Sequence, residues 1–357
     1  MIIRSIVRLG LIQRPPTKAT LPPLRTMSTA ATATIPIFNT LRALREWRSR
    51  AFAQNESVGF VATMGALHEG HMALVRRSLA ENDLTVCSIF VNPAQFAPHE
   101  DLASYPRNLP ADLAALSALE VKGRTPAAVF VPNALEMYPS GISQDPALQR
   151  GTFVEVMGYG QEMEGRSRPI FFRGVATVVT KLFNAVQPTR TYFGQKDIQQ
   201  ALLLRRMCKD LLMTLPYPEN LHIVPTVRDP ADGLALSSRN AYLSPSARHI
   251  ATVMPSALDV ARDAWEAGMT KDDCVKRAEQ YVAEVAERAR ADGAAEVRLD
   301  YIQLNDSDTF FEVPGHRTKD TWAQQSPHPV ILSGAIWVDK TRLIDNYILG
   351  DVDSIIY

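Results

Sequence analysis

Two histidines three positions apart follow a short apolar segment of the chain. Val58–Thr63 has the composition of a buried strand, and His68 and His71 stand in the turn Met64–His71 after it. Residues three apart share a helix face, so both imidazoles can reach one ligand. A helix start also offers free N–H groups and a positive dipole end. This turn therefore predicts phosphate binding, with the imidazoles donating to an α-phosphate that gains charge; the alternative is a pair of ordinary surface histidines.

Two later turns carry groups that also suit phosphate. Gly194–Asp197 follows a predicted strand, and its Lys196 offers a point charge for a triphosphate. Leu236–Arg239 places two serine hydroxyls beside an arginine fork, which together can clamp a phosphate. Each has an ordinary alternative, a solvated ion pair for the first and a serine-rich turn before a helix for the second. Their order along the chain, each at or beyond a strand end, favours one shared site.

Two glutamines stand where a small hydroxy acid could bind. Gln95 follows the second predicted strand and carries both a donor and an acceptor, although a loop amide is the simpler explanation for it alone. Gln200 lies one helical turn beyond Lys196 and points the same way.

Strands and helices alternate along the first part of the chain. The predicted strands are Val58–Thr63, Leu84–Val91, Ala127–Val131, Thr189–Phe193 and Leu221–Val227, and the predicted helices include His71–Leu79, Asp112–Leu119, Phe172–Val186 and Ile198–Leu212. Continuous apolar strands between helices indicate a parallel sheet covered on both faces. We expect an α/β, doubly wound, Rossmann-like sheet that binds its ligands at the carboxyl ends of the strands.

The pattern changes after about residue 243. Pro245–Ala291 is charged and alanine-rich and predicts two helices, followed by strands near Asp300–Leu304, Val330–Trp337 and Leu343–Leu349. We therefore expect three parts: a leader over 1–34, a Rossmann-like domain that binds the nucleotide and its co-substrate over 35–243, and a smaller α+β lid domain over 244–357.

Composition excludes several classes of protein. The 357 residues include 46% hydrophobic ones and equal numbers of basic and acidic side chains, 38 each, which is a globular and neutral balance. Neutrality argues against nucleic acid as an obligate partner. Three dispersed cysteines give no disulfide or zinc pattern. No apolar run reaches the roughly 18 residues that a membrane-spanning helix needs, so we expect no membrane partner.

The amino terminus has its own bias. From Met1 to Leu44 there is no acidic residue, and basic residues punctuate the segment at Arg4, Arg8, Arg14, Lys18 and Arg25. This is typical of a mitochondrial transit peptide and less so of a secretory signal. The alternatives are a leader without an address, or a start at Met27 that leaves a cytoplasmic protein. The sequence leaves cytoplasmic and mitochondrial locations equally open.

Across these motifs the chain resembles the pantoate–β-alanine ligases, a family of the nucleotidyltransferase superfamily. The resemblance rests on T-M-G-A-L-H-E-G-H (63–71), S-I-F-V-N-P-A-Q-F (88–96), Y-P-R (105–107), V-F-V-P-N-A-L-E-M-Y-P (129–139), F-R-G-V-A-T-V-V-T-K-L-F (172–183), F-G-Q-K-D-I-Q-Q (193–200), D-G-L-A-L-S-S-R-N (232–240) and T-R-L-I-D-N (341–346). It implies that ATP first activates pantoate as pantoyl adenylate with release of pyrophosphate. β-Alanine then displaces AMP and gives pantothenate.

The resemblance also implies roles for individual residues. His71 would be the proton donor, with His68 and Lys196 as the other catalytic groups. Gln95 would contact pantoate and β-alanine, and Gln200 pantoate. ATP would be held by Met64, Gly65, His68, His71, Gly194, Gln195, Lys196, Asp197, the backbone of Val227, Leu236, Ser237, Ser238 and Arg239. Mg²⁺ would accompany the triphosphate, with Asp112 as a nearby carboxylate, and relatives suggest a homodimer.

The chain departs from the family pattern at two positions near these motifs. Gln195 replaces a glutamate, and Phe171 replaces a histidine. Two other functions remain possible from the residues alone: a nucleotidyltransferase that moves AMP onto a phosphate acceptor, and a nucleotide-binding protein without activity.

Overall fold

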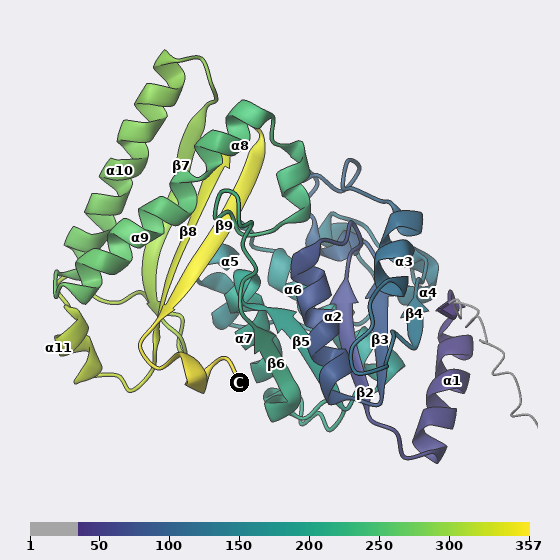
Figure 1. Ribbon diagram of the computed structural model, residues 1–357. Coiled ribbons are helices and arrows are strands. Elements are labelled where there is room, and N and C mark those ends of the chain that lie inside the picture. The colour runs from purple at the N-terminus through teal and green to yellow at the C-terminus, as the bar shows by residue number, and fades with distance from the viewer. Residues whose placement is uncertain (1–34) are drawn as a thin grey trace, which may run out of the picture. The chain divides into compact units, whose positions relative to one another are not determined.

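Six parallel strands form the larger of two sheets. The structure is a computed structural model that describes residues 35–357, one compact unit, and the predicted leader lies outside these residues. The strands are β1 (Ile37–Phe38), β2 (Val58–Thr63), β3 (Leu84–Ile89), β4 (Ala128–Phe130), β5 (Arg190–Gly194) and β6 (Leu221–Val224). Their order is β1-β4-β3-β2-β5-β6, all parallel (Figure 1). The expectation of a doubly wound parallel sheet is confirmed.

Helices cover both faces of this sheet. They are α1 (Leu41–Ala53), α2 (Glu69–Glu81), α3 (Leu109–Ser117), α4 (Ala134–Met137), α5 (Glu164–Ser167), α6 (Phe171–Val186) and α7 (Ile198–Asp210). Successive strand residues face opposite sides, so Phe60 belongs to the core cluster that contains residues of α1, α6 and α7, whereas Val61 belongs to the cluster that contains residues of α2 and α3. Both residues are fully buried, which explains why the strands are continuously apolar rather than alternating.

The sheet order brings the predicted site turns together. The strands β3, β2, β5 and β6 are consecutive neighbours, and all run in the same direction. Their carboxyl ends therefore meet at one edge of the sheet. The segments after Thr63, Ile89, Gly194 and Val224 leave from this edge.

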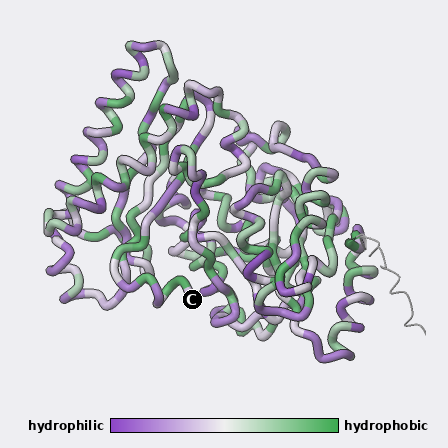
Figure 2. Tube along the Cα trace, in the orientation of Figure 1, coloured by the Kyte–Doolittle hydropathy of each residue, from purple (hydrophilic) through white to green (hydrophobic). Residues whose placement is uncertain are grey.

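A second sheet follows in the last third of the chain. It is antiparallel, in the order β7-β8-β9, from β7 (Val297–Asp306), β8 (Val330–Val338) and β9 (Thr341–Leu349). The helix α9 (Val253–Glu266) packs on β8 and β9, and α10 (Lys271–Ala291) packs on β7. Hydrophilic and hydrophobic residues alternate along α10 (Figure 2), because it buries Cys274, Ala278 and Val282 at a spacing of four. A short helix, α11 (Lys319–Ala323), precedes β8.

The prediction of two helices over Pro245–Ala291 is wrong in number. The structure has three, because α8 (Pro245–Ala251) ends before α9 begins. Pro255 explains the break: it has no N–H to donate to Ala251, so it is tolerated only in the first turn of a new helix. The predicted boundary near residue 243 falls just before α8, and the division into two domains stays a prediction.

The sequence analysis missed α1. Its inward face carries Arg48, which is only 2% exposed, between Leu44 and Ala51. The Arg48 guanidinium donates to the carbonyls of Val186 and Gln187 at the end of α6. A buried arginine interrupts the apolar stripe that helical periodicity relies on. Among the helices of residues 35–357, none is long and apolar enough to cross a membrane.

Candidate active site

One large cavity lies at the carboxyl edge of the parallel sheet. Its volume is about 1270 Å³, and residues of β7, β8 and β9 line its far wall. The residues predicted from sequence that line it are Met64, His68, His71, Gln95, Gly194, Lys196, Asp197, Gln200, Val227, Leu236, Ser237, Ser238 and Arg239. Gly65, Gln195 and Asp112 are not part of this lining.

The two histidines form the amino-terminal cap of α2. Nδ1 of His68 accepts from the N–H of Gly70 at 3.1 Å, and Nδ1 of His71 accepts from the N–H of His68 at 3.3 Å. This is a capping box made from two imidazoles. A ring nitrogen that accepts an N–H bond carries no proton, so in neutral rings the proton is on Nε2. The cap thus fixes the tautomer and orientation of both rings, whose centroids are 4.1 Å apart.

Both imidazoles are neutral in the substrate-free protein. Burial lowers the pKa of His68 to about 4, helped by the charge of Lys196. The pKa of His71 is lowered to about 3, mainly by burial and further by electrostatic interaction with His68 and then with Lys196. The positive charge of Lys196 thus acts on both rings, and all three residues line the same cavity. The structure therefore presents two neutral N–H donors, rather than an imidazolium acid, beside a fixed positive charge.

The turn before the cap depends on Asp112, which we predicted to lie near a metal ion. Its carboxylate, 3% exposed, accepts from the N–H groups of Ala66 at 3.0 Å and Leu67 at 2.7 Å. Gly65 and Ala66 have positive φ angles of 87° and 50°, and a Cβ on Gly65 would lie 3.0 Å from Asp112. Asp112 is thus a support for the turn, outside the cavity lining, and nothing in its contacts favours the metal assignment.

The turn after β5 is held from the second sheet. Asn346 of β9 donates to the backbone carbonyls of Gln195 and Lys196, both at 2.9 Å. The Gln195 side chain contacts Asn346 and the N–H of Thr226 rather than the cavity. Gln195 is not part of the cavity lining, so an amide in place of the glutamate that the resemblance implies leaves the charges of the lining unchanged. Lys196 lines the cavity, with its Nζ 3.7 Å from Asp197.

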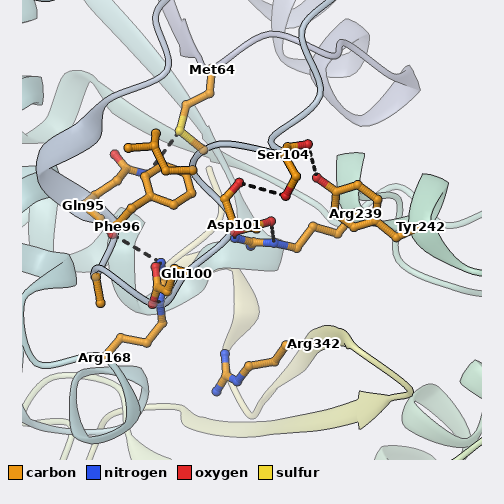
Figure 3. A network of polar contacts seen from close by, with 12 residues as sticks. Met64, Gln95, Phe96, Glu100, Asp101, Ser104, Arg168, Arg239, Tyr242 and Arg342 are labelled. Atoms are coloured by element: carbon orange, nitrogen blue, oxygen red, sulfur yellow. Dashed lines mark hydrogen bonds and ion pairs between the residues drawn. The ribbon is translucent and has the colours of Figure 1, made fainter. Parts of the chain in front are cut away.

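The serine–arginine segment is tied to the histidine turn. Ser238 Oγ donates to the carbonyl of Ala66 at 3.1 Å, and the N–H of Leu236 donates to Val227 at 3.0 Å. Arg239 does not project freely: Nε and Nη2 pair with the Asp101 carboxylate at 3.0 and 2.8 Å (Figure 3). Because Nε and Nη2 of Arg239 bond to Asp101, only Nη1 of this guanidinium has no hydrogen bond to the residues that the structure describes. Three separate turns thus share one cavity.

Gln95 is placed by a close approach of two segments. Asn92 donates to Gln95 Oε1 at 3.1 Å and to the carbonyl of Gly174 at 3.2 Å. A Cβ on Gly174 would lie 2.3 Å from the Ala94 carbonyl, so only glycine lets α6 approach this turn. Gln95 Nε2 contacts Met64 Sδ at 3.3 Å. Gln200 also lines the cavity, one helical turn beyond Lys196.

Sequence reasoning missed a set of charged residues in the cavity wall. Glu100 and Asp101 each hold a different arginine, Arg168 and Arg239 (Figure 3). Arg342 of β9 pairs with the nearly buried Glu164 and with Asp300. The acidic residues follow no spacing pattern, so no sequence signal assigns their partners. The segment T-R-L-I-D-N (341–346) carries part of the family resemblance, but nothing in its sequence indicates that it faces the cavity.

Comparison with known proteins gives a consistent result. A family model described as Pantoate-beta-alanine ligase matches residues 36–348. Pantothenate synthetase of Roseiflexus castenholzii is 43% identical over 309 residues, 87% of this chain and 98% of the relative. Pantoate–β-alanine ligase of Saccharomyces cerevisiae is 40% identical over 328 residues, 88% of this chain and 99% of the relative.

Solved structures are similar as well. Pantothenate synthetase of Thermus thermophilus has a TM-score of 0.71 at 38% identity, covering 88% of this chain and 99% of that one. Pantoate–β-alanine ligase of Francisella tularensis, complexed with β,γ-ATP and β-alanine, has a TM-score of 0.64 at 29% identity, covering 88% and 97%.

Proposed function

The chain belongs to the pantoate–β-alanine ligase family, and from that premise we propose how its cavity performs the ligation. The reaction joins pantoate to β-alanine at the expense of ATP, which becomes AMP and pyrophosphate. The observation that carries the assignment of residues is that the histidine turn, the Lys196 turn and the Ser237–Arg239 segment line one cavity.

The first step activates the carboxylate of pantoate. A carboxylate oxygen attacks the α-phosphorus of ATP, an O–P bond forms, and the bond to the β-phosphate oxygen breaks. The Nε2–H groups of His68 and His71 donate to the α-phosphate oxygens as charge builds there, because their Nδ1 atoms are occupied by the cap. Lys196, and Arg239 through its unpaired Nη1, stabilise the charge on the departing pyrophosphate. Because Nδ1 of His71 accepts from the N–H of His68, the ring stays neutral, and the proton-donor role that the resemblance implies is a hydrogen bond from Nε2–H to the phosphate rather than transfer of a proton.

The second step transfers the acyl group. The amine nitrogen of β-alanine attacks the acyl carbon of pantoyl adenylate, a C–N bond forms, and the C–O bond to the phosphate breaks. AMP leaves, and the nitrogen releases its extra proton to water. Gln95 and Gln200 hold the pantoyl group by its hydroxyls, and Gln95 also faces the incoming amine. Residues of both sheets line the cavity, which limits the access of water that would otherwise hydrolyse the acyl adenylate.

We propose that Mg²⁺ enters with the triphosphate rather than occupying a site built by the protein. Within residues 35–357 no group of three or more His, Cys, Asp or Glu side chains is placed to hold a metal ion. Mg²⁺ commonly takes most of its ligands from phosphate oxygens and water. When bound, it neutralises phosphate charge. Asp197 belongs to the Lys196 turn and lines the cavity. Its carboxylate is therefore the group of this turn best placed to approach the Mg²⁺ ion.

An AMP-release assay with each substrate omitted in turn tests the function. We expect AMP only with ATP, D-pantoate and β-alanine together, and pantoate-dependent exchange of pyrophosphate into ATP without β-alanine. A nucleotidyltransferase acting on a phosphate acceptor would show exchange independent of pantoate. A protein that only binds nucleotide would bind ATP and release no AMP.

Two further properties are proposals from the resemblance and the leader. We propose a homodimer, which light scattering would show as twice the chain mass of 39.5 kDa; a monomer at working concentration would refute it. We propose that the start site decides the compartment, mitochondrial from Met1 and cytoplasmic from Met27. Fluorescent fusions begun at each methionine distinguish these, and identical locations would contradict the idea.

A further inference from the structure

The carboxylate of β-alanine needs a partner that the family assignments above do not supply. The amine must reach an acyl carbon attached to a phosphate, so the carboxylate at the other end has to lie away from that negative charge. A fixed guanidinium is the side chain best suited to bind a carboxylate with two parallel bonds. The need for such a partner rests on the proposed function, because it concerns the second substrate of that reaction.

Six lysine and arginine side chains line the cavity: Lys196, Arg168, Arg239, Arg298, Lys340 and Arg342. Lys196 belongs to the turn after β5, and Arg239 follows Ser238, which bonds to the histidine turn, so both belong to the segments proposed to bind the triphosphate. Every side-chain nitrogen of Arg342 already has a carboxylate partner. Nε bonds to Asp300, and Nη1 and Nη2 bond to Glu164. Arg298 of β7 and Lys340 of the turn between β8 and β9 make no side-chain hydrogen bond or ion pair within residues 35–357, so nothing there fixes the orientation of either charge; Arg298 only stacks over Trp337 at 5.1 Å.

Arg168 remains, and its position is built rather than accidental. Nε and Nη2 bond to the two oxygens of Glu100 at 2.8 and 2.7 Å, and the guanidinium lies 3.9 Å from the ring centre of Phe171. The arginine and glutamate side chains are only 14% and 16% exposed. A guanidinium that stacks on a ring and forms two hydrogen bonds to one carboxylate keeps one orientation. Less conformational entropy of the side chain is therefore lost when a ligand binds it.

The free face of this arginine lies next to Gln95. Nη2 donates to the Gln95 backbone carbonyl at 3.3 Å, and the Gln95 side chain in turn contacts Met64 of the histidine turn (Figure 3). Nη1 makes no hydrogen bond to any residue of 35–357, although Arg168 is mostly buried and lines the cavity. Gln95 thus lies between the turn that would activate the acyl group and the two N–H donors of Nη1.

We propose that Arg168 binds the carboxylate of β-alanine through Nη1 and so selects an amino acid, rather than a simple amine, as the acyl acceptor. Glu100 is a positioning residue, because it holds the guanidinium without reaching the substrate. The amine then lies toward Gln95 and the acyl carbon, with the carboxylate at the Arg168 end.

The two half-reactions test this separately. In Arg168→Met, we expect the KM for β-alanine to rise roughly 10- to 100-fold, the effect of losing charged hydrogen bonds. Pantoate-dependent pyrophosphate exchange, which needs no β-alanine, should change much less. Propylamine, which lacks the carboxylate, should be a poor acceptor for the unmodified protein, and its kcat/KM relative to β-alanine should rise in the variant.

Two variants make the result specific. Glu100→Gln keeps the shape but loosens the guanidinium, so the KM for β-alanine should rise with little change in kcat. The matched control is Arg173→Met: Arg173 also pairs with a carboxylate, Glu155, and stacks on a ring, Phe153, but it is not part of the cavity lining. It should leave both half-reactions as they are. Thermal melts establish that each variant is folded.

The possible failures can be distinguished. If Arg168→Met is folded and retains the KM for β-alanine, Arg168 is not the carboxylate site. The same holds if exchange and β-alanine transfer fall equally, since that indicates a general disturbance; should this variant be unfolded, Arg168→Lys, which keeps the charge but loses the fork, decides in its place. If the unmodified protein shows no pantoate-dependent exchange, the proposed function itself fails.

Discussion

The hydroxyl of Ser238 donates a 3.1 Å hydrogen bond to the backbone carbonyl of Ala66, which lies 172 positions earlier in the chain. This bond joins the serine–arginine segment to the turn that precedes the two histidines. Had these segments been far apart, no single triphosphate could have contacted both, and the proposed reaction would have had no site. The bond therefore fixes the distance on which the mechanism depends.

Replacing Ser238 with alanine removes this connection. We expect the rate of pyrophosphate release to fall about 10-fold, and the free energy of unfolding by only about 1 kcal/mol, the value of one neutral hydrogen bond. Pre-steady-state pyrophosphate release and a denaturant titration measure the two. Ser49→Ala, on the exposed face of α1, is the control. A large loss of stability with an unchanged rate would assign Ser238 a purely structural role.

His71→Ala removes one neutral donor from the cavity. Losing a single donor to a charge-developing group slows reactions by about 10²–10³, so we expect that decrease in the pyrophosphate-forming step. Rapid-quench measurement with ATP and pantoate alone isolates the step. His249→Ala, at an exposed position of α8, should behave like the unmodified protein. Normal pyrophosphate release by His71→Ala would eliminate this residue from the first step.

The low pKa values of the two histidines predict how stability depends on pH. The folded values are about 4 for His68 and about 3 for His71, against an ordinary value of 6.5 in the unfolded chain. Below about pH 6.5 the unfolded chain therefore binds protons at these rings that the folded protein does not, and this favours unfolding. Stability should fall as pH falls from about 6.5 toward 4. Denaturant titrations at pH 7.5 and pH 5 measure this, and a difference that is not smaller in His68→Gln would contradict the burial argument.

Asp112→Asn distinguishes a support from a metal ligand. The amide can accept at only one of the two positions where the carboxylate accepts from Ala66 and Leu67. We expect a loss of about 1–3 kcal/mol in the free energy of unfolding, with lower activity. The Mg²⁺ concentration for half-maximal activity should stay the same. A strong increase in that concentration, with stability intact, would restore the metal assignment.

Removing residues 1–34 tests the leader. The compact unit begins at Ile35, and its first strand and helix follow directly. We expect the truncated protein to release AMP at the same rate and to melt at the same temperature. A folded but inactive truncation would show that the leader contributes to the site.

Much of the fold could be predicted because its signals are local. Val58–Thr63 is recognisable as a buried strand, and β2 has those bounds. The helix predicted over Phe172–Val186 agrees with α6 to within one residue. Periodicity failed at α1, where buried Arg48 takes the place of an apolar side chain, and over Pro245–Ala291, where a proline allows three helices in a stretch predicted to hold two. In both cases the deciding contact or bond is not visible in the apolar pattern.

By itself, the sequence determined which chemical groups the protein presents and the order in which they occur. His68, His71, Lys196 and the Ser237–Arg239 segment follow strand ends, and strand ends of a parallel sheet meet at one edge. Only the tertiary structure decided how these groups are held and charged. A pKa depends on burial and on neighbours from distant segments, and an ion pair such as Glu100–Arg168 forms between residues 68 positions apart. Neither a pKa nor the partner of a charged residue is determined by local sequence, so both could be assigned only from the tertiary structure.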